Sequence, residues 1–157
     1  KEQERIRERG VWIAHCPQSN TNLASGIAPV RRFLEQGLRV GLGSDVAGGS
    51  SASMFRAMTD AIQVSKLYWR LVDSEKKPLT LEEVFYMATV GGGSFFEKVG
   101  TFAPGYQMDA LVLDDRRLNR MGGYTIRERL ERICYLSDER EIAAKYVAGK
   151  AIFDHVN

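Results

Sequence analysis

Apolar residues occur along the chain in short runs typical of buried strands and in longer stretches with helical spacing. Runs at residues 11–14 and 39–45 predict two buried strands. A helix is expected to start at Pro29 and end at Gly37, and another to run from about residue 53 to residue 69. Strand, helix, strand, helix at this spacing predicts parallel strands joined by crossovers, and hence an α/β fold.

One side of the helix at 53–69 carries a stripe of residues at helical spacing, and we expect this stripe to pack in the core or at an interface. Its members are Met54, Met58, Ile62, Ser65 and Trp69. A capping box at Thr80 and Glu83 predicts a further helix, because each side chain can satisfy a free backbone amide. The glycines at 91–93 are expected to break that helix, and Ser94 could start a short one.

From about residue 100 the pattern changes to short strands and turns. The expected elements are a strand at 110–113, a helix opened by a capping box at Thr125 and Glu128, and a hairpin at 145–153 that turns at 148–149. We therefore predict a boundary near Gly100, with one unit over residues 1–99 and a second over residues 100–157.

Composition and charge narrow the class of protein. The chain has 157 residues, 44% of them hydrophobic, which is enough for one good core. The net charge is +2 and no basic block is interleaved with aromatic residues, so no nucleic-acid partner is expected. No apolar run approaches the roughly 18 residues of a membrane span, and the charged start is unlike a signal peptide, so no membrane partner is expected. Cys16 and Cys134 are interpreted as free thiols of a cytoplasmic protein.

Two side chains that could bind a metal or transfer a proton lie at the ends of the two predicted parallel strands. His15 ends the first strand and Asp45 the second, so both are expected at the same C-terminal face. A histidine and an aspartate brought together there are candidates for metal ligation or proton transfer. The alternative is that Asp45 only caps the next helix, whose start lies in residues 50–53. This stretch alone favours neither interpretation.

These two residues do not complete a metal site, because a catalytic zinc takes three or more protein ligands. The other histidine, His155, lies in a predicted frayed tail, so most ligands would be missing from this chain. The polar residues after His15 are interpreted as turn formers of a loop and not as substrate contacts: Gln18, Ser19, Asn20 and Asn22. Gly48 and Gly49 are expected to permit an unusual backbone path.

Two segments resemble a known family. His15-Cys-Pro-Gln-Ser-Asn-Thr-Asn-Leu-Ala-Ser-Gly26 and Gly41-Leu-Gly-Ser-Asp-Val-Ala-Gly-Gly49 closely resemble the C-terminal half of guanine deaminases in the amidohydrolase superfamily. Other aminohydrolases and chlorohydrolases share the first three residues of one segment and the Gly-Ser-Asp of the other. The continuation Asp-Val-Ala-Gly-Gly favours guanine. Residues 80–85, 105–113 and 147–150 are also similar, so the resemblance covers nearly the whole chain.

The resemblance implies a (β/α)₈ TIM barrel with a small β-sandwich built from both chain ends. Because a full barrel takes about 250 residues, the chain looks like a fragment. Residues 1–99 would supply the last two barrel strands and their helices, beginning late in the sixth barrel helix. Residues 100–157 would supply the C-terminal part of the sandwich.

The resemblance also implies the chemistry, which is hydrolytic deamination of guanine to xanthine and ammonia by a zinc-activated water. Asp45 would bind the zinc and accept or relay a proton, whereas His15 would support the site without binding metal. The other zinc ligands would lie outside the chain, the isolated fragment is expected to be inactive, and the complete protein is expected to be a cytoplasmic homodimer. Two alternatives stay open: another aminohydrolase or chlorohydrolase acting on a purine, pyrimidine or triazine, and a noncatalytic structural fragment.

Overall fold

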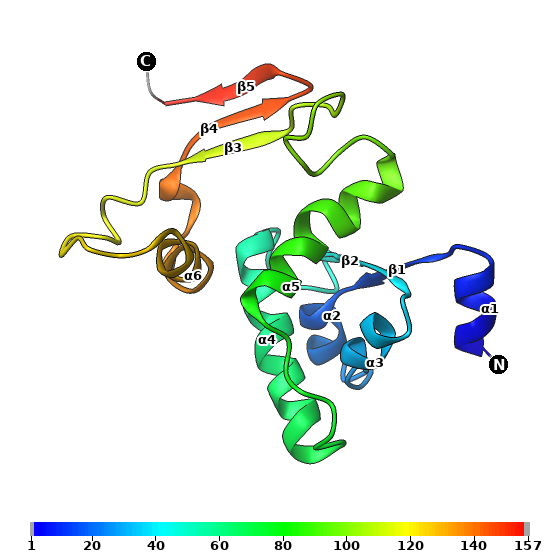
Figure 1. The fold of residues 1–157 in the computed structure, drawn as a ribbon. Coiled ribbons are helices and arrows are strands. Elements are labelled where there is room, and N and C mark those ends of the chain that lie inside the picture. The colour runs from blue at the N-terminus through cyan, green and yellow to red at the C-terminus, as the bar shows by residue number, and fades with distance from the viewer. Residues whose placement is uncertain (1, 156–157) are drawn as a thin grey trace.

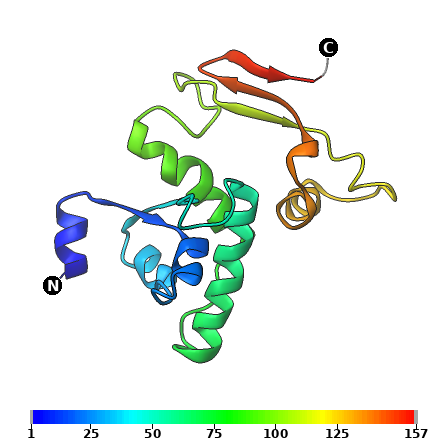
Figure 2. The same ribbon diagram turned by 180° about the vertical axis from the view of Figure 1, so that it is seen from behind.

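A computed structural model of the chain describes residues 2–155, which form a helical body around two short strands and a three-stranded sheet beside it (Figures 1 and 2). The elements in order are α1 (Glu2–Glu8), β1 (Trp12–His15), α2 (Pro17–Asn22), α3 (Val30–Glu35), β2 (Arg39–Leu42), α4 (Met54–Leu71), α5 (Leu81–Tyr86), the π-helical turn η1 (Met87–Gly91), the 3₁₀ helix η2 (Ser94–Phe96), β3 (Ala110–Leu113), α6 (Ile126–Leu136), the 3₁₀ helix η3 (Glu139–Glu141), β4 (Ile142–Val147) and β5 (Lys150–Asp154).

The two N-terminal strands are parallel neighbours, as the sequence predicts. Their register pairs Ile13 with Val40 and His15 with Leu42. Two boundaries differ from expectation. β2 ends at Leu42 and not at residue 45, so Asp45 lies in the loop that follows. The segment after His15 is the short helix α2 and not a loop, because Pro17 occupies its first turn and Thr21 donates its hydroxyl to the Pro17 carbonyl at 2.9 Å.

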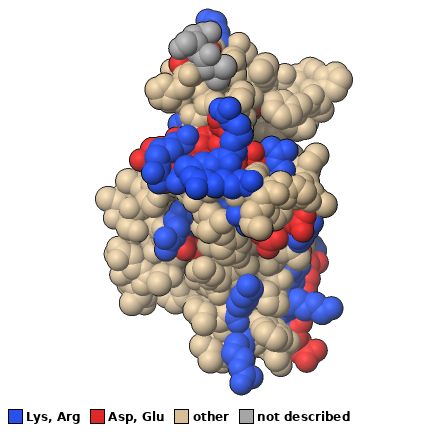
Figure 3. Space-filling model, turned by 90° about the vertical axis from the view of Figure 1, so that its left-hand side faces the viewer, with Lys and Arg blue, Asp and Glu red and all other residues tan. Residues whose placement is uncertain are grey.

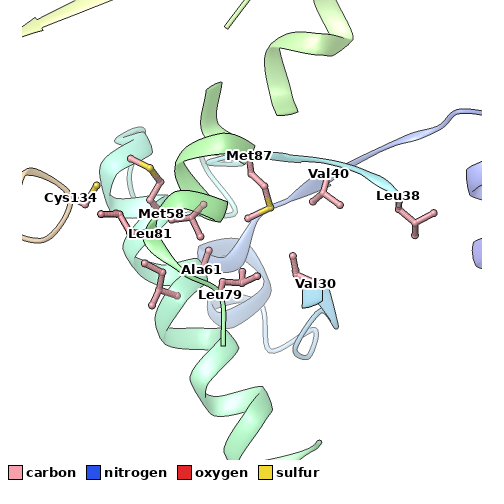
Figure 4. Close-up of a cluster of buried hydrophobic side chains, with 11 residues drawn as sticks. Val30, Leu38, Val40, Met58, Ala61, Leu79, Leu81, Met87 and Cys134 are labelled. Atoms are coloured by element: carbon pink, nitrogen blue, oxygen red, sulfur yellow. The ribbon is translucent and has the colours of Figure 1, made fainter. Parts of the chain in front are cut away.

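The main core lies between β2, α3, α4 and α5 (Figure 4). Ala61, Val84 and Met87 are completely inaccessible to solvent, and Val30 and Val40 pack in the same cluster. The predicted side of α4 is buried only in its first half: Met58 and Ile62 belong to the core, whereas Trp69 is 42% exposed. The first half of α4 is therefore the part that holds the strands in place.

The glycines at 91–93 do not break the helix, which corrects the sequence prediction. The helical path continues from α5 through η1 to η2. A Cβ on Gly91 would lie 2.7 Å from the Val40 carbonyl oxygen, and one on Gly41 would lie 2.9 Å from the Gly92 Cα. Glycine is required here because strand β2 and this helical segment are in backbone contact.

The second sheet has the order β3-β4-β5 with antiparallel pairing. Its β4–β5 hairpin turns at Ala148 and Gly149, both with positive φ, as the sequence predicts. The amide of His155 donates to the Ala143 carbonyl at 2.8 Å, so His155 continues the sheet edge and is not frayed, although its side chain is exposed.

Helix α6 lies within the second predicted unit but packs on α4 of the first. The buried hydroxyl of Thr59 donates to the Cys134 carbonyl at 2.8 Å, and the Cys134 side chain belongs to the main core. Both cysteines are free thiols, as expected. The boundary near residue 100 stays a prediction, and the contact shows that one core joins elements from both sides of it.

Ion pairs hold the segment around α6. Arg129 contacts Asp115 at 2.7 Å, and Arg117 contacts the buried carboxylate of Glu141 at 2.6 Å. Figure 3 shows Lys and Arg side chains, with Asp and Glu between them, gathered in a band on this side of the molecule. Within residues 2–155, no helix combines the length and apolar character needed to cross a membrane.

Candidate functional site

The C-terminal ends of β1 and β2 bring the two predicted site segments to one edge of the parallel pair. His15 is the last residue of β1, and its carbonyl oxygen accepts the Gly43 amide at 2.9 Å. This bond continues the strand pairing one residue beyond Leu42 and directs the chain into the loop of residues 43–51. His15 and the loop with Asp45 therefore lie at the same end of adjacent parallel strands, as predicted.

Asp45 has a left-handed backbone with φ of 48°, and its side chain is exposed. Its carbonyl oxygen accepts the Gly49 amide at 2.6 Å, which closes a tight turn. A Cβ on Gly48 would lie 2.8 Å from the Asp45 carboxylate, and one on Gly49 would lie 2.2 Å from the Ser44 carbonyl oxygen. These two glycines therefore permit close approach inside the turn.

The structure contradicts the interpretation of Asp45 as a helix cap. Helix α4 is capped by Ser53, whose hydroxyl oxygen accepts the Arg56 amide. Asp45 lies well before this cap, on the turn after β2, and its exposed carboxylate remains open to a ligand from outside. A charged acceptor at the C-terminal end of a parallel strand is a typical position for catalytic groups in α/β barrels.

His15 is only 4% exposed, and its Nδ1 has no hydrogen-bond partner within residues 2–155. Burial lowers the pKa of His15 from 6.5 to about 4, since the charged imidazolium would lose its hydration. The ring is therefore neutral at physiological pH. A neutral buried imidazole can accept a hydrogen bond or shape the site, but it cannot supply positive charge to it.

Cys16 follows His15 and lies close enough to Asp45 for the charge of that carboxylate to affect the pKa of the thiol. Burial, and to a smaller degree the negative charge of Asp45, raises the pKa of the Cys16 thiol. A Cβ on Gly43 would lie 2.8 Å from Cys16 Sγ, so the thiol packs directly against the start of the loop.

The polar residues of α2 do more than form a turn. Gln18 Oε1 accepts the Ser51 amide at 2.9 Å, and Gln18 Nε2 donates to the Asp60 carboxylate at 2.8 Å. Asn22 Nδ2 donates to the Gly48 carbonyl at 2.9 Å. These two side chains are thus engaged with the 43–51 loop and with α4. The sequence analysis did not identify Asp60. The feature that could have indicated it is an acidic residue on the buried side of α4.

The donor set available for a metal ion is small. No group of three or more His, Cys, Asp and Glu side chains that could hold a metal occurs within residues 2–155. Asp45 offers one exposed carboxylate, whereas the His15 ring is enclosed. The chain thus fits a zinc site as the donor of one ligand, and further ligands would have to come from outside it.

Comparison with known proteins places these features in a family. The sequence profile of the Amidohydrolase family matches residues 1–152. The guanine deaminase of Mus musculus is 38% identical over 157 residues, covering 92% of this chain and 34% of that protein. The crystal structure of guanine deaminase from C. acetobutylicum with bound guanine is 47% identical, covers 97% of this chain and 36% of that chain, and superposes with a TM-score of 0.92.

An adenosine deaminase from Xanthomonas campestris with bound zinc has the same fold, with a TM-score of 0.82 at 24% identity, over 98% of this chain and 34% of that chain. This chain therefore spans about a third of the length of the relatives it matches. The comparisons also agree with the mixture of helices and strands described above.

Proposed function

Because this chain belongs to the amidohydrolase family, we propose that the protein of which it is a part hydrolyses guanine to xanthine and ammonia. The observation that carries this proposal is the 47% identity, over 97% of the chain, to a guanine deaminase crystallised with guanine. The loop of residues 43–51 supports it, since this loop presents an exposed carboxylate at the end of a parallel strand.

We assign β1 and β2 to the seventh and eighth strands of a (β/α)₈ barrel, and β3 to β5 to the C-terminal part of a small β-sandwich. Support comes from a wide apolar cleft of about 1830 Å³ between the helical body and the sheet, which reaches Trp12, Phe95 and Leu111. Such a cleft is a suitable surface for the rest of a longer chain. The division into units at 1–99 and 100–157 belongs to the same proposal, with α6 bridging the two.

Asp45 is proposed as the zinc ligand that this chain contributes. Its carboxylate is a hard oxygen donor, it is exposed, and it follows β2 at the strand end where the family resemblance places an aspartate. Zinc, when bound, would supply a water-derived nucleophile at neutral pH. Asp45 itself would take up a proton at its carboxylate and pass it toward the departing amino group.

His15 is proposed as a supporting residue that does not bind metal. Its ring is buried at the C-terminal end of β1 and neutral at physiological pH, so it adds no positive charge there. The Gly43 amide donates to its carbonyl, so His15 fixes where the Asp45 loop begins. Neither the neutral buried ring nor the fixed start of the loop requires His15 to contact the substrate directly.

Activity of the full-length protein on a panel of nucleobases and nucleosides tests the proposed function. We expect guanine to be deaminated with little turnover of adenine or cytosine. A clear preference for a chlorotriazine or an adenosine-type substrate would assign the protein to another branch of the superfamily.

The noncatalytic alternative applies to the chain in isolation. Since one carboxylate cannot hold a catalytic zinc, we expect the isolated chain to lack both bound zinc and deaminase activity. Metal analysis of the isolated chain beside the full-length protein separates these cases. A homodimer located in the cytoplasm completes the proposal, and sedimentation of the full-length protein with fractionation of cells would test these two points.

A further inference from the structure

The loop of residues 43–51 is held by two side chains of α2. Asn22 Nδ2 donates to the Gly48 carbonyl at 2.9 Å, and Gln18 Oε1 accepts the Ser51 amide at 2.9 Å. Gln18 Oε1 also accepts the Ser50 hydroxyl at 3.3 Å. All of these contacts lie after Asp45, so they fix the returning half of the loop on the helix that follows His15.

The orientation of the Gln18 amide is determined by α4. Its Nε2 donates to the Asp60 carboxylate at 2.8 Å, and Asp60 is only 8% exposed. Arg56 Nε donates to both oxygens of the same carboxylate, at 2.9 and 3.1 Å. Because a carboxylate can only accept, the amide nitrogen of Gln18 must face Asp60 and its oxygen must face Ser51.

We propose that Gln18 is a positioning residue, which holds the Asp45 loop through Ser51 and takes its own orientation from the buried Asp60. The effect on catalysis rests on the proposed function, since it requires the Asp45 carboxylate to take part in the reaction. Gln18 acts on the loop backbone and does not contact the reacting atoms. Its contribution is to keep Asp45 in register with groups supplied by the rest of the protein, where a displacement of about 1 Å can cost ~100-fold in rate.

Three variants of the full-length protein test this proposal. Gln18→Glu preserves shape but sets a carboxylate against that of Asp60. The double variant Gln18→Glu with Asp60→Asn reverses the polarity of the bond, because the amide introduced at position 60 can donate to the carboxylate introduced at position 18. Gln63→Glu makes the same chemical change at an exposed position of α4 and serves as the control.

We expect Gln18→Glu to lower kcat by about 10–100-fold with a smaller change in KM, since the loss is one of alignment. Hydrogen exchange of the peptide that spans residues 43–51 should become faster in the substrate-free protein. The double variant should return both quantities to within about threefold of the unmutated protein, as expected for two directly coupled residues. Gln63→Glu should change neither.

Unchanged loop exchange in Gln18→Glu, or a double variant no better than the single one, would overturn the proposal. Because Asp60→Asn also removes the repulsion between the two carboxylates, rescue shows that positions 18 and 60 are coupled, and the exchange of residues 43–51 shows whether this coupling acts on the loop. The exchange experiment needs no substrate, so it decides the role of Gln18 in the loop independently of activity. An unmutated protein without guanine deaminase activity would instead refute the proposed function.

Discussion

The amide of Gly43 donates to the carbonyl oxygen of His15 at 2.9 Å, one residue beyond the last paired position of the two parallel strands. This contact determines where β2 ends and where the loop with Asp45 begins. It joins two segments that the chain separates by the helices α2 and α3, and it brings a buried neutral imidazole and an exposed carboxylate to one strand edge.

Acid should destabilise the protein through His15. The folded-state pKa of about 4 lies below the ordinary value of 6.5, so between these values the unfolded chain binds a proton that the folded chain does not. Stability therefore rises with pH across this window, and about 3 kcal/mol present above pH 6.5 is lost by pH 4. Urea unfolding of the metal-free, full-length protein at several pH values measures this dependence.

The matched variant for this test is His15→Gln, which removes the titrating group at the same buried position. Its absolute stability can change, but the slope of stability against pH between 4 and 6.5 should become shallower. Equal slopes for the two proteins would show that His15 does not produce the dependence.

The contact between β2 and the glycine-containing helical segment predicts a strong difference between two alanine substitutions. Gly41→Ala would place its Cβ 2.9 Å from the Gly92 Cα, so the backbones must separate, at a cost of about 1–3 kcal/mol. Gly92→Ala meets the Met87 carbonyl oxygen at 3.2 Å and the Gly41 Cα only at 4.0 Å, and it gains helix propensity. Urea unfolding should show a clear loss for the first variant and little change for the second. Similar losses would contradict the close-approach explanation.

Local signals predicted the elements whose cause lies within a few residues. The capping boxes at Thr80 and Thr125 both form, with each hydroxyl and its partner glutamate bonded as expected. The continuous helix through residues 91–93 could not be predicted, because the reason for those glycines is the approach of β2 from elsewhere in the chain. Helix α2 was missed since its polar sequence resembles a loop and its bonds to the 43–51 loop are nonlocal.

In the candidate site, too, some features could be predicted from the sequence and others depend on contacts between distant residues. The shared edge of His15 and Asp45 follows from the alternation of elements and is found in the structure, although Asp45 lies in the loop after β2 and not in the strand itself. The bond between Gln18 and Asp60 joins residues 42 positions apart, so no local pattern reveals it. A metal site could not be predicted from this sequence alone, because no group of three or more His, Cys, Asp and Glu side chains that could hold a metal occurs within residues 2–155.

The contact between α6 and α4 predicts that Thr59 stabilises both sides of the proposed domain boundary. Thr59→Val keeps the shape but leaves the Cys134 carbonyl without its 2.8 Å partner in a buried setting, which should cost about 1–2 kcal/mol. Thr21→Val is the control, since Thr21 is exposed and bonds only within α2, and its cost should stay below about 0.5 kcal/mol. Equal losses in thermal or urea unfolding would mean that the interhelical bond contributes little.

The turnover of guanine by the full-length Asp45→Asn protein, measured together with its zinc content, tests whether Asp45 takes part in the reaction. Asparagine has nearly the same shape and retains one oxygen, so the fold should persist, but it has no negative charge to balance zinc and cannot take up the proton. We predict that kcat falls by roughly 10²–10⁴-fold, with weaker zinc binding adding to the loss. Turnover within a few-fold of the unmutated enzyme at unchanged zinc content would contradict the assignment of Asp45 as a catalytic residue.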